Sequence, residues 1–151
     1  FMIGGIVEEG RGGVLGSDAV GSYERIVCCA SGAAQGLLQP FLDNQVMFKN
    51  QMPTPETSIP EPGHLPLPHA LRIVMDSFTS ATERHIEVGD GLEVFIVRSM
   101  KPRASEETAT TAQQPAMDIS LEQFGAVDAL GGEDAFTPGA CMVIRRELKK
   151  D

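Results

Sequence analysis

Three side chains that can act as nucleophiles lie close together in the stretch IVCCASGAAQG, at residues 26–36. Cys28, Cys29 and Ser31 follow a β-branched segment and precede a small-residue turn and a predicted helix. Strand, tight turn and helix is the layout that presents nucleophiles in several hydrolase folds. A thiol or hydroxyl nucleophile also needs a base within hydrogen-bonding distance and a group that orients the base. The question is whether the rest of the chain supplies them.

The candidate bases are three histidines, and none of them carries a recognisable catalytic signature. His64 and His69 lie in a proline-rich stretch, and His85 follows the second predicted helix, where a capping cation is the commoner role. The turn also lacks the G-x-S-x-G pattern. Free cysteines are most often small buried hydrophobic residues. We therefore predict that Cys28 and Cys29 point to opposite faces of a strand, one of them into the core.

Two other patterns could bind ligands, and each has a simpler interpretation. The glycine-rich run at residues 4–13 carries two glutamates and no Lys-Ser/Thr ending, so it indicates a hairpin turn and not a phosphate cradle. The acids Asp128, Glu133 and Asp134 do not match the spacing of a calcium-binding loop, so they indicate a solvated face. No Cys/His spacing fits zinc. The sequence predicts no metal and no cofactor.

The elements that position these residues come in runs. Strands are predicted over residues 1–8, 13–17, 23–30, 92–99 and 140–148. Helices are predicted over about 33–48 and 66–85, and the second should bury a stripe of apolar residues: Leu71, Val74, Met75 and Phe78. Pro40 requires either that the first helix starts near Leu37 or that it kinks. Strands, then helices, then strands is an α+β order.

Two segments are predicted to be surface inserts. Residues 50–68 are so rich in proline that an extended, exposed connection is expected. Residues 101–139 are acidic and rich in Thr, Ala, Gln and Gly, which indicates a mostly disordered insertion with one short helix around Ser120–Phe124.

Composition limits the class of protein and of partner. A chain of 151 residues with 42% hydrophobic residues is ordinarily one globular domain. Its net charge of −9 disfavours nucleic acid and anionic membranes as partners. No apolar run is long enough to span a bilayer, and three cysteines without a disulfide pattern favour a reducing compartment, the cytosol or nucleus. The start on Phe1, inside an apolar strand, leads us to expect a longer natural polypeptide.

The stretch GSYERIVCCASGAAQGLLQPFLDNQVMFKN, at residues 21–50, resembles the β-type subunits of the 20S core proteasome. Within that family, LLQPFLDNQVMFKN at 37–50 is most similar to the sixth β subunit, which is non-catalytic in eukaryotes. Residues 4–25, 70–97 and the ending RRELKKD match as well. The resemblance thus covers nearly all of the chain outside the two inserts.

The resemblance implies a four-layer α-β-β-α sandwich of the N-terminal-nucleophile hydrolase type, with residues 1–151 as the C-terminal part of one domain. It implies a non-catalytic structural subunit of the proteasome β ring, in cytoplasm and nucleus, that takes part in ubiquitin-dependent protein degradation. Its partners would be the other α and β subunits, and peptide substrates or inhibitors held in the adjacent subunit. Two alternatives stay open: an active threonine endopeptidase whose N-terminal Thr lies in the absent half, and a free-standing thiol hydrolase using Cys28 or Cys29.

The resemblance also assigns roles to individual positions. Ala33 stands where active subunits keep a Ser near the nucleophile, and His85 stands where they keep an Asp. Both are therefore expected to be degenerate catalytic positions. The turn after the first strand would border the substrate channel of a neighbouring chymotrypsin-like subunit. There Val7 replaces an acid, with Glu8 and Glu9 beside it, and we expect a more apolar shared pocket.

Overall fold

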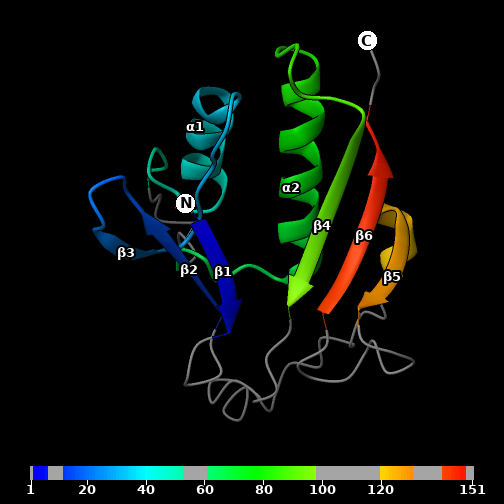
Figure 1. The fold of residues 1–151 in the computed structure, drawn as a ribbon, viewed down its shortest axis with the longest axis horizontal. Helices are drawn as coiled ribbons and strands as arrows, with labels where there is room; N and C mark the ends of the chain where they lie inside the picture. The colour runs from blue at the N-terminus through cyan, green and yellow to red at the C-terminus, as the bar shows by residue number, and fades with distance from the viewer. Residues whose placement is uncertain (1, 7–11, 53–60, 98–119, 131–140, 149–151) are drawn as a thin grey trace. The chain divides into compact units, whose positions relative to one another are not determined.

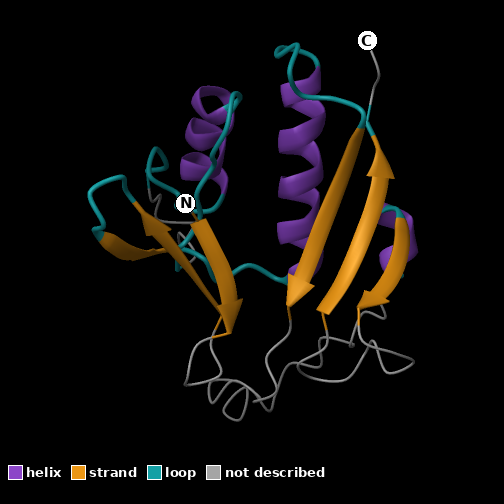
Figure 2. Ribbon diagram, viewed as in Figure 1, coloured by secondary structure: helices purple, strands orange, loops and turns teal. Residues whose placement is uncertain are grey.

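The computed structural model describes residues 2–6, 12–52, 61–97, 120–130 and 141–148. The chain divides into two compact units. Unit 1 holds residues 1–3, 14–92 and 147–151, and unit 2 holds residues 4–13 and 93–146. Figure 1 shows the course of the chain and Figure 2 its helices and strands.

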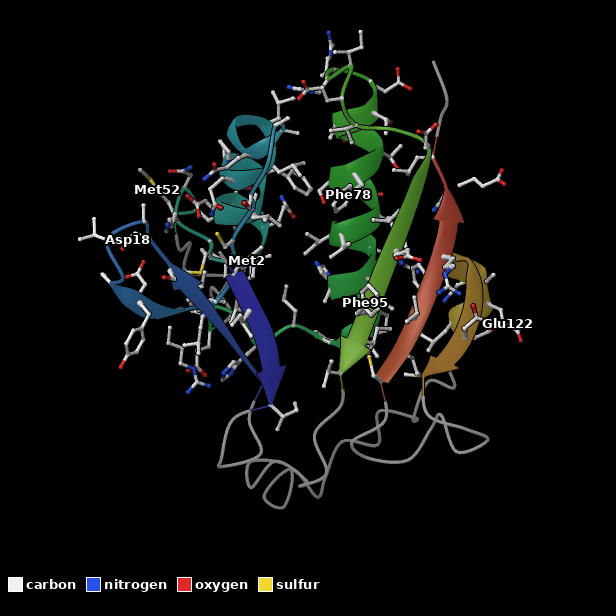
Figure 3. All side chains as sticks on the ribbon, viewed as in Figure 1. Met2, Asp18, Met52, Phe78, Phe95 and Glu122 are labelled. Atoms are coloured by element: carbon white, nitrogen blue, oxygen red, sulfur yellow. The ribbon has the colours of Figure 1, made fainter. Side chains whose placement is uncertain are left out.

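The first sheet is a three-stranded meander in the order β1-β2-β3, as the short turns predicted. β1 spans Met2–Ile6, β2 spans Gly12–Ser17 and β3 spans Tyr23–Ile26. β2 and β3 pair antiparallel, with Ser17 opposite Tyr23. The turn between them is fixed by Asp18, whose Oδ1 accepts hydrogen bonds from the backbone N–H groups of Val20 and Ser22, both at 2.9 Å. Figure 3 shows Asp18 in this turn.

β3 is shorter than the sequence predicted, because it ends at Ile26 and not at Ala30. Beyond Ile26 the backbone leaves the ladder: the N–H of Ala30 donates to Oε1 of Gln39, on the following helix, at 2.8 Å. A side chain thereby satisfies a donor that a continued strand would have paired with its neighbour. The cysteine pair therefore lies in an irregular segment.

Helix α1 spans Gln35–Gln45, inside the predicted range, and continues through Pro40. Pro40 has no N–H to donate to the carbonyl of Gly36, one turn earlier. Of the two predicted alternatives, a helix start near Leu37 is not observed, since α1 begins two residues before it. The kink at Pro40 stays a prediction. Leu38 is the buried residue of α1, and it packs in a cluster with Ala30, Ala34 and Ala81.

Helix α2 spans Leu67–Thr82 and carries Pro68 in its first turn, where the missing N–H costs no helical hydrogen bond. Leu71 and Met75 are buried as predicted, while Val74 and Phe78 are partly buried. The buried surface is wider than the predicted stripe and also includes Ile73, Ser77, Ala81 and Thr82. The hydroxyls of Ser77 and Thr82 donate to helix carbonyls three residues earlier, so they are buried with their hydrogen bonds made.

The two helices lie side by side within unit 1 (Figure 1). Ala34, just before α1, packs in the same cluster as Ala81, near the end of α2. The start of one helix therefore meets the end of the other. Small side chains at this crossing allow the backbones to approach closely.

The second sheet has the order β4-β6-β5. β4 spans Gly91–Val97, β5 spans Ala126–Leu130 and β6 spans Cys141–Glu147. β5 pairs antiparallel with β6, with Val127 opposite Ile144. Three consecutive residues of the central strand β6, Met142, Val143 and Ile144, are at most 1% exposed. Successive side chains point to opposite faces, so both faces of β6 are covered.

The predicted disordered insertion is corrected where the structure describes it. A 3-10 helix at Leu121–Phe124 agrees with the short helix expected there, and its Leu121 and Phe124 are buried. β5 then follows as a paired strand that the composition did not reveal. β5 carries only five residues inside a segment that is acidic as a whole, and its pairing with β6 is not visible in that composition. The remainder of 101–139 lies outside the described residues.

These elements confirm helices with antiparallel strands in the predicted α+β order. The four-layer sandwich stays a prediction. None of the helices among the described residues is long and apolar enough to cross a membrane.

Candidate functional site

A groove of about 660 Å³ lies in unit 1, around the residues that first suggested chemistry. The ends of β2 and β3 form one wall, and the segment Val27–Cys29 borders it directly. Gln39 and Asp43 of α1 and Lys49, after the helix, supply polar side chains. The site thus combines two thiols with charged side chains of both signs.

Both cysteines border the same groove, and neither lies on a strand, so the premise of the predicted alternation between two strand faces is not met. Alternation along a strand requires extended, ladder-paired backbone, and that backbone ends at Ile26. Cys28 and Cys29 are each partly buried and free. Cys29 Sγ lies 3.3 Å from the carbonyl oxygen of Ala30, to which it donates.

The surroundings of Cys28 oppose formation of its thiolate. Partial burial raises the pKa of this thiol above its ordinary value, and the carboxylate of Asp43 raises it further. Lys49 acts in the opposite direction, and Cys29 adds a small upward contribution. Since the thiolate is the nucleophile, the groove holds Cys28 in its less reactive form.

No residue that lines the groove is a histidine. Ser31 is exposed in the turn before α1. Among the described residues the structure therefore brings together thiols without the base that a thiol hydrolase requires. Neither the cysteines nor Ser31 forms a catalytic constellation there.

A chain of polar contacts holds the wall of the groove, and sequence reasoning missed it. Gln39 Nε2 donates to Asp43 Oδ1 at 3.1 Å, and Lys49 Nζ lies 3.1 Å from the same oxygen. These contacts lower the pKa of Asp43, with the Lys49 hydrogen bond as the largest cause. The available signal was the spacing of four between Gln39 and Asp43, which places both on one side of a helix.

Ala33 and His85 lie at neighbouring ends of the helix pair. Ala33 is exposed, next to the buried Ala34, and its methyl group offers no polar contact. The His85 N–H donates to the carbonyl of Ala81 at 2.8 Å. The Nδ1 of His85 accepts a hydrogen bond from the N–H of Glu87 at 3.3 Å, so the partly buried ring stabilises the turn that follows α2.

The remaining predicted positions are Val7, Glu8, Glu9 and Asp128. Val7, Glu8 and Glu9 lie outside the described residues. Asp128, considered for calcium, instead pairs with Arg145 across the strands of unit 2. The described part of the chain contains no group of three or more His, Cys, Asp or Glu side chains that could hold a metal ion.

Comparison with known proteins identifies close relatives of this chain. It is 54% identical over 98 residues to the proteasome subunit beta type-6 of Saccharomyces cerevisiae, a match that covers 64% of this chain and 41% of that protein. The probable proteasome subunit beta type-6 of Schizosaccharomyces pombe is 47% identical over 97 residues, covering 63% and 43%. The proteasome subunit beta type-1 of Danio rerio is 48% identical over 98 residues, covering 64% and 38%.

No family model matches the chain. The chain spans about two fifths of the length of the curated relatives it matches. Identities of this size over nearly a hundred residues confirm the resemblance that the motifs of residues 21–50 predicted. Over these residues the chain is similar to proteasome beta subunits of types 6 and 1.

Proposed function

We propose that this chain serves as a structural, non-catalytic subunit in the β ring of the 20S core proteasome, in cytoplasm and nucleus. Its role there is to close the proteolytic chamber, fix the register of the ring and form one wall of a neighbouring subunit's peptide site. The single observation that carries this proposal is the 54% identity to a proteasome subunit beta type-6. Its partners would be the other α and β subunits of the particle.

The candidate site supports the non-catalytic part of the proposal. Ala33 places a methyl group at the position where the resemblance expects a serine, and it is exposed beside a groove-forming helix. The histidine at position 85 has its Nδ1 engaged by the N–H of Glu87. A Thr nucleophile needs hydrogen-bonding partners for orientation and proton transfer, and a methyl group supplies none.

Native mass spectrometry of the tagged chain, purified from its own cells, tests the structural role. We expect it in a hetero-oligomer many times heavier than the 16.2 kDa chain, together with other proteasome α and β subunits. Recovery as a small monomer would overturn the assembly role. The same preparation tests the proposed location when it is split into cytoplasmic and nuclear fractions.

A covalent probe directed at N-terminal threonine tests the catalytic status in the same particle. The neighbouring active subunits should be labelled, while the polypeptide that contains this chain stays unlabelled. Labelling of that polypeptide, with a processed Thr at its mature N-terminus, would instead support the active peptidase. The labelled neighbours serve as the internal control for an intact particle.

The proposed wall of the neighbouring site depends on Val7, with Glu8 and Glu9 beside it. If Val7 makes that pocket more apolar, a Val7→Asp variant should change the sensitivity of the chymotrypsin-like activity to inhibitors that carry a polar group aimed at the pocket. A matched inhibitor without that group is the control. Equal sensitivity of variant and parent to both inhibitors would remove this role.

A further inference from the structure

The two adjacent cysteines offer a binding chemistry that the proposed function does not use. Both are free, both are partly buried, and both border one groove of about 660 Å³. They are close enough for Cys29 to influence the titration of Cys28. The segment is held in place by the hydrogen bond from Ala30 N–H to Gln39 on α1. The structure therefore places two free, neighbouring cysteines at one groove.

Covalent geometry disfavours a direct disulfide between these neighbours. Consecutive Cα atoms are about 3.8 Å apart, whereas disulfide-linked residues usually have Cα atoms about 4.4–6.8 Å apart. A disulfide here would be strained and easily reduced. An atom inserted between the sulfurs avoids that strain, because the two sulfurs can then lie farther apart than the S–S bond of about 2.05 Å requires.

We propose that Cys28 and Cys29 together form a dithiol binding site for trivalent arsenic compounds. Trivalent arsenic is a soft centre that binds two thiolates at once. Soft ligands such as thiolates select soft centres. The groove supplies room for an organic substituent on the arsenic. Burial and Asp43 disfavour the Cys28 thiolate in the free protein and Lys49 favours it, and formation of the As–S bond removes the thiol proton. This site is independent of the proteasome role.

The reaction involves no change of oxidation state. Phenylarsine oxide reacts with the two thiols, two As–S bonds form and the As–O bond breaks. The oxygen leaves as one water molecule, which takes up both thiol protons. Arsenic stays trivalent, so neither an oxidant nor a reductant is required. The product is a ring that includes both sulfurs, the arsenic and the backbone between the two residues.

The test uses phenylarsine oxide and the native full chain. Intact-mass analysis should show one phenylarsenic group per chain, retained in excess monothiol and released by a small dithiol. Subsequent alkylation and peptide mapping should find Cys28 and Cys29 protected together, while Cys141 remains alkylated to the same extent as in untreated protein. This protection measurement needs no variant and therefore does not depend on variant folding.

Single substitutions provide the second arm of the test. Cys28→Ser and Cys29→Ser should each weaken retention in excess monothiol by at least about tenfold, because one As–S bond is lost. Cys141→Ser is the matched control and should retain the arsenical like the parent, since it removes a thiol from β6 and leaves the groove unchanged. Unchanged retention in both groove variants would overturn the proposal. So would capture that occurs only after unfolding in urea.

Discussion

Gly32 in unit 1 and Gly125 in unit 2 both have positive φ and hold the chain in conformations that other residues rarely adopt. Gly32, with φ +94°, lies in the turn before α1, and a Cβ atom built on it would meet nothing within 4 Å. Gly125, with φ +154°, joins the 3-10 helix to β5, and its Cβ would collide with the backbone carbonyl of Arg145 and approach Ile144 at 3.0 Å. The turn at Gly32 is therefore open, whereas the turn at Gly125 is closed by atoms of β6.

The difference separates a place where the fold tolerates change from one where it does not. Around Gly32 the exposed Ser31 and Ala33 have room for other side chains. Around Gly125 the neighbouring atoms belong to backbone and to the completely buried Ile144, so they cannot give way. A side chain in the open turn can therefore be exchanged for a reactive or an inert one without loss of the fold, which agrees with the alanine at position 33.

The largest expected effect is that of Gly125→Ala. The backbone region that Gly125 occupies, with φ +154° and ψ −173°, is essentially restricted to glycine, and the new methyl group would also overlap the Arg145 carbonyl. We expect the free energy of unfolding to fall by about 3 kcal/mol or more. Urea denaturation followed by circular dichroism measures this. A loss below about 1 kcal/mol would show that β5 and the 3-10 helix do not pack as described.

Gly32→Ala should have a smaller effect, because the positive φ remains costly but no atom opposes the methyl group. We expect a loss of about 1 kcal/mol in the same urea titration. Gly36→Ala is the matched control: Gly36 lies within α1, a methyl group added there would have no neighbour within 4 Å, and the variant should gain roughly 0.5–1 kcal/mol from helix propensity. If Gly32→Ala lowers the free energy of unfolding as much as Gly125→Ala does, the difference in packing between the two turns is contradicted.

Sequence reasoning reached the long, periodic elements and missed what depends on single contacts. The helix pair, the meander and β6 were predicted because apolar spacing and turns mark them. The end of β3 at Ile26 depends on one hydrogen bond from Ala30 to Gln39, nine residues later, which periodicity cannot reveal. β5 was missed because pairing with β6, and not its own composition, makes it a strand.

The candidate site was predicted in its residues but not in its arrangement. Cys28, Cys29, Ala33 and His85 could be named from residue type and from the resemblance. That both cysteines share one groove with Asp43 and Lys49 could not, because it requires the strand to end and α1 to fold back beside it. Ser31 does not line the groove, which residue type alone cannot predict.

The alkylation rate of Cys28 in the groove should change when Asp43 is replaced. Because that carboxylate raises the pKa of the thiol, Asp43→Asn should increase the rate of Cys28 alkylation at pH 8 by a few-fold, since each unit of pKa changes the thiolate fraction by about tenfold. Lys49→Met is the opposing control and should slow alkylation. Mass spectrometry of the Cys28 peptide measures both. Identical rates in the parent and the two variants would contradict the described groove.

Cys28 and Asp43 also contribute to the pH dependence of stability. The folded-state pKa of Cys28 is raised, so above the ordinary thiol range the unfolded state ionises first and the free energy of unfolding falls. The folded-state pKa of Asp43 is lowered, so its stabilising contribution is present above the ordinary carboxyl range and is lost as the pH falls through the folded-state value. In urea titrations from pH 7 to 10, Cys28→Ser should flatten the alkaline decline, and Cys141→Ser is the matched comparison.

The smallest expected effect is that of Arg145→Met in unit 2. Like the turn at Gly32, the ion pairs of Arg145 are exposed to solvent. Arg145 Nε lies 2.8 Å from Glu93 Oε1 and also pairs with Asp128, and all three side chains are at least half exposed. These carboxylates raise the pKa of Arg145, but solvent screens exposed ion pairs strongly. Arg145→Met should therefore change the urea midpoint only slightly, and added salt should remove the difference. A loss comparable to that of Gly125→Ala would show that charge, and not close packing, holds β5 on β6.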